Sequence, residues 1–193
     1  VFETPTSENA MTGIDVGMSL NNNPCVMMHQ RLDFFLLAMD QLVNSAAKWH
    51  YMFGGKKSVP ITIRLVVGKG WGQGPTHSQS LQSWFSHIPG LKVVMPTFPG
   101  DAYNLLKTSI RDPNPVIFIE HRWLHNLEQE TKKIKYKNQK YLPELISKGK
   151  DFTVVSYSLS TIEILSLKKV LKLNNISFDL IDLKSIKPLN ISM

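Results

Sequence analysis

The 193-residue sequence contains a single cysteine and no apolar run of membrane-spanning length. One cysteine, Cys25, excludes a disulfide framework and suits a reducing compartment. No apolar run approaches the roughly 20 residues that a membrane span needs, and no signal peptide is visible. The charged fraction of 19% beside a hydrophobic fraction of 42% excludes a disordered chain. We expect a packed protein of the cytoplasm, or of the mitochondrial matrix or plastid in a eukaryote.

Acidic side chains are outnumbered by basic ones, 15 to 22, which gives a formal net charge of +7. The excess is local, because residues 131–150 hold seven lysines against one acid, Glu144. A charge run confined to a connecting segment is typical of a solvated linker. Nucleic-acid-binding proteins instead spread basic residues over a folded face with interleaved aromatic residues. We therefore expect neither a nucleic-acid partner nor a membrane.

The phosphate-binding glycine motifs are also missing, although GKGWGQGPTHSQS, residues 68–80, has four glycines in seven positions. A P-loop needs Gly-Lys-Ser or Gly-Lys-Thr, but Lys69 is followed by Gly70. The dinucleotide fingerprint G-x-G-x-x-G fails because the glycines alternate strictly with other residues. Glycine loses much conformational freedom on folding, so the run predicts either a bare glycine loop or the close approach of a ligand.

Apolar runs and helical periodicities alternate along the first part of the chain, which favours a parallel α/β sheet. Continuous apolar runs predict strands at 23–30, 59–67, 91–96 and 114–121. Helical spacing predicts helices from about Glu8, at 34–53, at 80–88 and at 99–112. After the lysine-rich segment the pattern restarts with a strand at 151–158, a helix at 160–175 and a strand at 176–189. Three such elements cannot bury both faces of a sheet, so we expect the opening of a second, truncated domain.

Among six histidines, His77 is the best acid/base candidate. Ligands of open parallel sheets lie beyond the carboxyl ends of strands, and the glycine loop delivers His77 to that edge. Imidazole titrates near neutrality, although a loop histidine bonded to the backbone is the simpler interpretation. The other histidines show no metal-ligand spacing and predict no zinc site: His29, His50, His87, His121 and His125.

Two further residues stand at helix entrances. Glu8 follows a Pro-Thr-Ser turn, where a carboxylate stabilises a helix N-terminus through the helix dipole. Phe34 belongs to the Asp-Phe-Phe that opens the helix at 34–53, where core packing is the default role of an aromatic ring. Neither residue indicates a function by itself.

These residues lie in phrases that resemble the β subunit of thiamine-diphosphate-dependent 2-oxo acid dehydrogenases of the pyruvate, branched-chain and acetoin types. More distantly, the chain resembles the pyrimidine-binding domain of transketolase. The phrases are VFETPTSENAMTGIDVGMS, FFLLAMDQLVNSAAKWHYMFGG, VPITIRLVVGKGWGQGPTHSQS, HIPGLKVVMPTFPGDAYNLLKTSIRDPNPVIFIE, and VVSYS with IDLKSIKPL. The resemblance implies a thiamine-diphosphate-binding α/β domain at 1–125 without its N-terminal part, a linker at 126–149, and the beginning of the transketolase C-terminal α/β domain at 150–193.

The resemblance also implies a role for each singled-out residue. Glu8 corresponds to the glutamate that hydrogen-bonds the pyrimidine ring nitrogen of the cofactor. Phe34 stands where the family stacks an aromatic ring on that pyrimidine, and His77 matches the active-site histidine near the reacting centre and the lipoyl group. IRDPNP resembles a monovalent-cation loop, which would hold potassium through the carbonyls of Ile61, Ser109 and Ile110 with Asp112 and Asn114.

The family's diphosphate and magnesium motif, Gly-Asp-Gly followed by paired asparagines, is absent from this sequence. In the heterotetrameric enzymes it lies on the α subunit, so the resemblance implies an α2β2 assembly whose α subunit holds Mg²⁺. It also implies a dihydrolipoyl acyltransferase core as a partner, and oxidative decarboxylation of a 2-oxo acid with acyl transfer to lipoyl. Two alternatives stay open: ketol transfer of the transketolase type with its halves on separate chains, and a non-catalytic pairing subunit. Gln30 and Leu37, near the stacking ring, leave the oxo acid unidentified.

Overall fold

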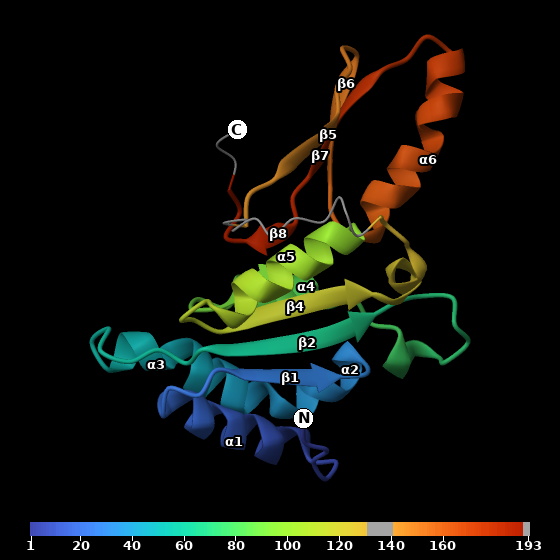
Figure 1. Ribbon diagram of the computed structural model, residues 1–193. Helices are drawn as coiled ribbons and strands as arrows, with labels where there is room; N and C mark the ends of the chain where they lie inside the picture. The colour runs from blue at the N-terminus through green and yellow to red at the C-terminus, as the bar shows by residue number, and fades with distance from the viewer. Residues whose placement is uncertain (131–140, 191–193) are drawn as a thin grey trace.

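The computed structural model describes residues 1–130 and 141–190, which form two sheets (Figure 1). The first sheet has five strands in the order β1-β2-β4-β3-β8, and the second has three in the order β5-β7-β6. The strands of the first sheet are β1 (Cys25–His29), β2 (Ile61–Val67), β3 (Lys92–Val94), β4 (Val116–His121) and β8 (Ser185–Lys187). Those of the second are β5 (Glu144–Ser147), β6 (Phe152–Ser156) and β7 (Phe178–Asp182). The expected parallel α/β architecture is confirmed for β1 to β4, which are mutually parallel.

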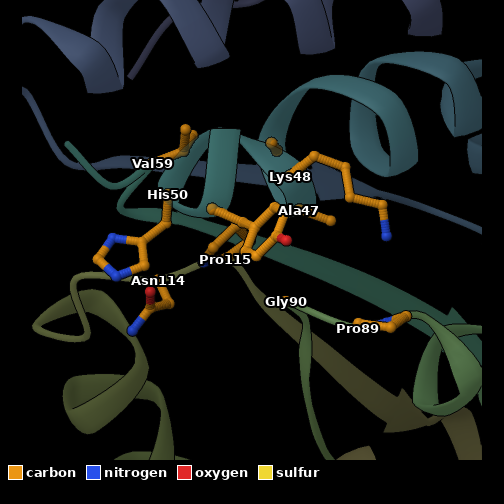
Figure 2. A pocket seen from close by; sticks show the side chains of 10 residues that line it. Ala47, Lys48, His50, Val59, Pro89, Gly90, Asn114 and Pro115 are labelled. Carbon is orange, nitrogen blue, oxygen red and sulfur yellow. The ribbon is translucent and has the colours of Figure 1, made fainter. Parts of the chain in front are cut away.

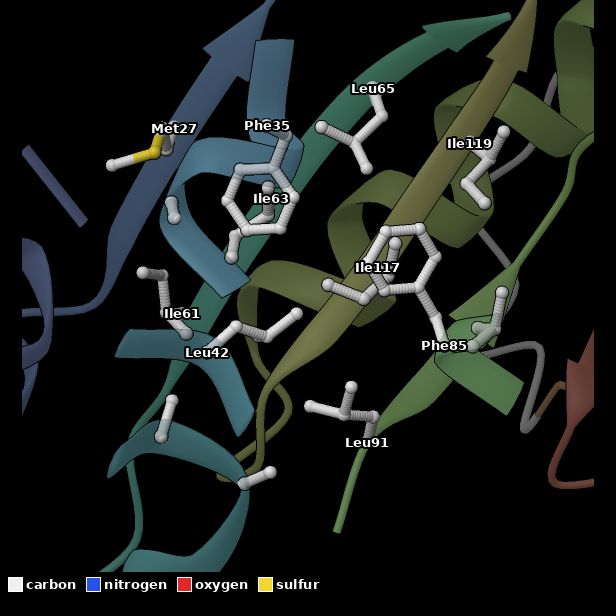
Figure 3. Packing of buried hydrophobic residues seen from close by; sticks show 14 of the residues in the cluster. Met27, Phe35, Leu42, Ile61, Ile63, Leu65, Phe85, Leu91, Ile117 and Ile119 are labelled. Atoms are coloured by element: carbon white, nitrogen blue, oxygen red, sulfur yellow. The ribbon is translucent and has the colours of Figure 1, made fainter. Parts of the chain in front are cut away.

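The helices cover both faces of the first sheet. They are α1 (Glu8–Leu20), the helical segment from Leu32 to Met52, α4 (Gln82–His87) and α5 (Pro99–Ile110). A further helix, α6 (Leu159–Leu173), connects β6 to β7 of the second sheet. On one face, Phe35 and Phe85 pack from the helices onto Ile63, Leu65 and Ile117 of the central strands (Figure 3). This apolar core forms because β2 and β4 are buried on both faces, as their continuous apolar runs predicted.

A smaller apolar cluster on the other face centres on α5. Leu105 of this helix packs with Val94, Val116 and Phe118 of the strands, and Tyr141 joins them from within the lysine-rich segment. Within the described residues, no helix is both long and apolar enough to cross a bilayer.

The single helix predicted at 34–53 is wrong in detail. Helical structure begins at Leu32 and changes its hydrogen bonding along its length: α2 (Leu32–Phe35), a 3-10 turn η1 (Leu36–Ala38), a π-helical stretch η2 (Gln41–Ala46) and α3 (Ala47–Met52). A π turn widens the helix by one residue, which lets the adjacent Ala46 and Ala47 both face the core. Glycine is required at position 90, which faces Ala47 (Figure 2), since Gly90 has a φ of +94° and a Cβ there would overlap the Ala47 carbonyl. The periodicity of apolar residues in the sequence does not reveal such a local change in helical hydrogen bonding.

The strand predicted at 176–189 is two strands that belong to different sheets. β7 runs parallel to β6 in the second sheet, whereas β8 pairs antiparallel with β3 in the first. Between them Lys184 takes a left-handed backbone conformation, φ +57°, and turns the chain. Its buried ammonium forms ion pairs with Asp101 at the start of α5 and with Glu144 of β5. β8 is therefore an antiparallel edge strand on an otherwise parallel sheet, which the sequence analysis did not predict.

The segment predicted as a linker, 126–149, contains structure near its end. Glu144–Ser147 is strand β5, which pairs antiparallel with β7. The lysine-rich composition concealed a four-residue strand, because its stabilising partner lies more than thirty residues further along the chain. Residues 131–140, which hold most of the lysines, lie outside the described part of the chain.

Asp182, at the end of β7, is a carboxylate without exposed surface. Its Oδ1 accepts a hydrogen bond of 3.3 Å from the Thr161 hydroxyl. Burial raises the pKa of Asp182 to about 6, against the opposing hydrogen bond of Thr97 and charge of Lys184. The folded state therefore binds more protons than the unfolded state between pH 3.8 and about 6, and this group lowers stability as pH rises through that window.

We expect Asp182→Asn to stabilise the protein above pH 6, because the amide keeps the hydrogen-bond acceptor and removes the buried charge. The gain in unfolding free energy should be about 2–3 kcal/mol at pH 8 and should vanish near pH 4. Urea denaturation of both proteins from pH 4 to pH 8 measures it. Two pH profiles that stay parallel throughout would contradict the raised pKa.

Candidate functional site

The predicted site residues Phe34 and His77 meet at the carboxyl ends of β1 and β2. β1 and β2 are parallel neighbours, with Cys25 opposite Ile61 and His29 opposite Leu65, so the segments that leave them begin side by side. The segment after β1 leads into α2, and the segment after β2 is the glycine loop. Between them lies a cavity of about 420 Å³, lined by Gln30, Arg31, Phe34, Gln73 and His77.

The backbone of the glycine loop explains its alternating glycines. Gly70, Gly72 and Gly74 have φ values of +70°, +71° and +73°, a left-handed region that side chains rarely adopt. The loop then closes on itself, because the Trp71 indole N–H donates to the Ser78 hydroxyl at 2.7 Å. His77 ends the 3-10 turn η3 (Pro75–His77), and the repeated left-handed residues carry it to the cavity.

Phe34 and His77 present their rings to each other in an edge-to-face arrangement. The ring centroids are 5.3 Å apart and the ring planes are inclined by 87°. Phe34 is 36% exposed, whereas its neighbour Phe35 is fully buried. Asp33 holds the two segments together, since its Oδ1 accepts bonds from the backbone N–H of Gln79 at 3.3 Å and from its side-chain amide at 2.8 Å. A flat molecule stacked on Phe34 would therefore have the His77 imidazole at its edge.

Glu8 begins α1 and lies near the same end of the sheet. The Thr12 hydroxyl, one turn later, contacts both the Glu8 carbonyl at 2.8 Å and the Met27 sulfur of β1 at 3.6 Å. Glu8 is half-buried, and its charge acts on His29, the last residue of β1. The structure thus brings Glu8 to the end of β1, while Phe34 and His77 follow the ends of β1 and β2.

His29 is a residue of this region whose place the sequence analysis missed. It is only 6% exposed, its Nε2 lies 2.9 Å from the Met27 sulfur, and its ring contacts Phe35 at a centroid distance of 5.0 Å. Burial lowers the pKa of His29, and the Glu8 carboxylate opposes that shift. A neutral imidazole therefore lies beside Glu8. The alternation along β1 was the available signal, because His29 shares the inward parity of Cys25 and Met27.

The five residues of the predicted cation loop lie elsewhere. Ile61 begins β2, Ser109 and Ile110 end α5, and the loop through Asp112 and Asn114 precedes β4, so the set lies at the amino-terminal edge of the strands. Carbonyl oxygens at the end of α5 suit a cation, because the helix dipole is negative there.

The carboxylate in this loop already has partners from the chain. Asp112 pairs with the Lys92 ammonium and accepts the Tyr141 hydroxyl at 3.0 Å and the Asn114 backbone N–H at 3.0 Å. A potassium ion would therefore be held by peptide carbonyls rather than by this carboxylate. Within residues 1–130 and 141–190 no group of three or more histidine, cysteine, aspartate or glutamate side chains forms a metal site.

Residues 1–126 match the family described as "Transketolase, pyrimidine binding domain". The chain belongs to this family. The match covers β1 to β4 and therefore includes the cavity between β1 and β2. The donor types present fit the pyrimidine of thiamine diphosphate, since the region supplies a carboxylate and an exposed aromatic face.

Similar curated proteins confirm the resemblance to dehydrogenase β subunits. The chain is 38% identical over 190 residues to the acetoin:2,6-dichlorophenolindophenol oxidoreductase subunit beta of Cupriavidus necator, covering 98% of this chain and 56% of that protein. It is 37% identical over 191 residues to the pyruvate dehydrogenase E1 component subunit beta of Porphyra purpurea, covering 99% of this chain and 58% of that protein. The chain thus spans somewhat more than half the length of these relatives.

Comparison with solved structures shows a shared fold. One, described as "Split gene transketolase, inactive beta4 tetramer", aligns with a TM-score of 0.78 over 95% of this chain and 56% of that one. Its sequence identity of 19% means that the likeness concerns the fold alone.

In this pyrimidine-binding domain the neighbours Phe34 and Phe35 offer a matched pair of substitutions. We expect Phe34→Ala to change the unfolding free energy by less than about 1 kcal/mol, because the ring is already partly in solvent. Phe35→Ala should cost about 3–5 kcal/mol through the cavity that it leaves. Urea denaturation compares them, and equal losses would show that Phe34 is an ordinary core residue.

Proposed function

We propose that this chain is the pyrimidine-binding part of the β subunit of a thiamine-diphosphate-dependent 2-oxo acid dehydrogenase. The proposed reaction is oxidative decarboxylation of a 2-oxo acid with acyl transfer to a lipoyl group. One observation carries the proposal: an exposed Phe34 ring and a perpendicular His77 imidazole, 5.3 Å apart, share one cavity at the carboxyl ends of β1 and β2. The relatives named above support the choice of reaction class.

Each residue contributes a separate function. Phe34 offers a stacking face for the pyrimidine, worth about 0.5–1.5 kcal/mol beyond its buried area. The Glu8 carboxylate accepts a hydrogen bond from a ring nitrogen and so selects the tautomer of the bound ring. His77 exchanges a proton at its imidazole with the substrate or with the lipoyl sulfur. When bound, thiamine diphosphate supplies the carbon nucleophile that attacks the oxo group, which is the part no side chain can perform.

The same proposal includes partners. The sequence has no Gly-Asp-Gly motif with paired asparagines, so the diphosphate and Mg²⁺ are assigned to an α subunit in an α2β2 assembly. A dihydrolipoyl acyltransferase core would receive the acyl group. The cytoplasm is the proposed compartment, or the mitochondrial matrix or plastid in a eukaryote.

Glu8→Gln tests whether the site is catalytic. We expect turnover by the full-length subunit, assembled with its α subunit, to fall by about 10²-fold or more, since proton-transfer effects are of that size. Asp15→Asn is the matched control, because it removes another carboxylate from the same helix about two turns beyond Glu8. Equal turnover of Glu8→Gln and the wild type would favour the non-catalytic pairing subunit.

Analysis of the products in that assay distinguishes oxidative decarboxylation from the remaining alternative, ketol transfer. A lipoyl acceptor or an artificial electron acceptor should receive the electrons of a decarboxylated oxo acid. Transfer of a two-carbon unit to a sugar acceptor, with no decarboxylation of an oxo acid, would instead identify a ketol transferase.

We further propose that the loop from Ser109 to Asn114, with Ile61, binds potassium through peptide carbonyls. Potassium that binds only the folded state stabilises it by about 2.7 kcal/mol at a hundred times its dissociation constant. We expect a higher melting temperature in potassium chloride than in choline chloride at equal ionic strength. Identical melting temperatures across a potassium titration would exclude the site.

A further inference from the structure

Arg31 is the one side chain with a permanent charge among the residues that line the Phe34–His77 cavity. It directly precedes α2, in an extended conformation with φ −141° and ψ +141°, and is partly buried. The predictions from motifs gave it no role. Its guanidinium therefore brings a positive charge to a cavity in which chemistry is proposed.

The guanidinium is held by neutral groups on three sides. Its Nε and Nη2 donate to the Gln73 side-chain oxygen at 3.1 Å and 2.9 Å, and Nη1 donates to the Gln30 carbonyl at 2.7 Å. Its central carbon lies 4.3 Å from the centroid of the Trp71 ring, a cation–π contact. Glycine-loop and strand-end residues together orient the arginine before any ligand arrives.

The positive charge of Arg31 is not neutralised within the part of the chain that the structure describes. The ion pairs there involve Arg64, Lys69, Lys92 and Lys184, and none includes Arg31. Three of its five N–H donors are used by Gln73 and Gln30, which leaves one N–H on each terminal nitrogen. A preorganised guanidinium with donors to spare is a receptor for a carboxylate or phosphate group.

We propose that Arg31 binds the carboxylate of the substrate and makes the site selective for anionic 2-oxo acids over neutral hydroxyketones. This inference rests on the proposed function and adds the residue that selects its anionic substrate. The carboxylate of a 2-oxo acid is bonded directly to the reacting carbon, so one small substrate can reach both Arg31 and His77 in the same cavity. The question is open among the relatives, since one is named for pyruvate and another for acetoin, which carries no charge.

The pair between Arg31 and the carboxylate would act on binding more than on the chemical step. The carboxylate leaves as neutral carbon dioxide, so the attraction does not strengthen towards the transition state. An interaction of this kind lowers KM without raising kcat. Arg31 is therefore a specificity-determining residue, and its substitution should raise KM for the anionic substrate.

The test compares Arg31→Gln with Arg31→Lys in the full-length subunit assembled with its α subunit. Pyruvate and the neutral ketone acetoin are the probes, each with thiamine diphosphate, Mg²⁺ and an artificial electron acceptor. We expect Arg31→Gln to raise KM for pyruvate by about 10- to 100-fold, the size of a charge-assisted hydrogen bond, with kcat nearly unchanged. KM for acetoin should not change. Arg31→Lys should raise KM for pyruvate by an intermediate factor, because lysine keeps the positive charge but lacks the paired N–H donors of a guanidinium.

Arg122→Gln is the control, because Arg122 lies after β4, outside the cavity lining. Equal rises of KM for pyruvate and acetoin would overturn the proposal, as would an unchanged KM for pyruvate. A weakened α–β association in Arg31→Gln with unchanged KM would show that Arg31 instead pairs with the partner chain.

A binding measurement distinguishes failure of this inference from failure of the proposed function. Titration of the wild-type assembly with pyruvate, methyl pyruvate and inorganic phosphate, followed by NMR of the arginine side-chain N–H groups, requires no turnover. A shift of the Arg31 signals with pyruvate but not with its uncharged ester supports the inference even if no oxo acid is turned over. A response to phosphate alone would overturn it and identify a phosphate-bearing substrate.

Discussion

The parallel backbone ladder between β1 and β2 is the constraint on which the candidate site depends. Its register sets His29 opposite Leu65, so both strands point their carboxyl ends at the same edge of the sheet. The register is fixed by β1, which buries only one face, so a one-residue slip would turn Cys25, Met27 and His29 out of the core. Phe34 and His77, 43 positions apart in sequence, are consequently neighbours in space.

A second layer of polar contacts converts this proximity into a defined geometry. Asp33 clamps Gln79, and Arg31 ties Gln73 and Trp71 to the end of β1. These bonds join the segment after β1 to the segment after β2 on both sides of the cavity. The glycines suit this loop, because the chain adopts left-handed conformations at three alternate positions on its way back to Phe34.

The two edges of the first sheet have different kinds of charge arrangement. At the carboxyl edge, Arg31 and His77 face a cavity and have donors to offer. At the amino edge, Lys92 and Asp112 satisfy each other, with Tyr141 completing the cluster. Charges that pair within the chain stabilise the fold, whereas a charge held only by neutral groups is available to a ligand. Lys184, paired with Asp101 and Glu144, belongs to the first kind and links the two sheets.

The local pattern of the sequence determined the four parallel strands of the first sheet and the motif residues. Continuous apolar runs identified β1 to β4, and Glu8, Phe34 and His77 were recognised from the phrases around them. The tertiary structure alone decided where the ends of those elements meet, where strand 176–189 breaks, and that Glu144–Ser147 is a strand. These features depend on partners far along the chain, such as Asp101 for Lys184. Arg31 belongs to the same class: nothing in its neighbours distinguishes it, and only the folded loop shows that its charge is unpaired within the described chain.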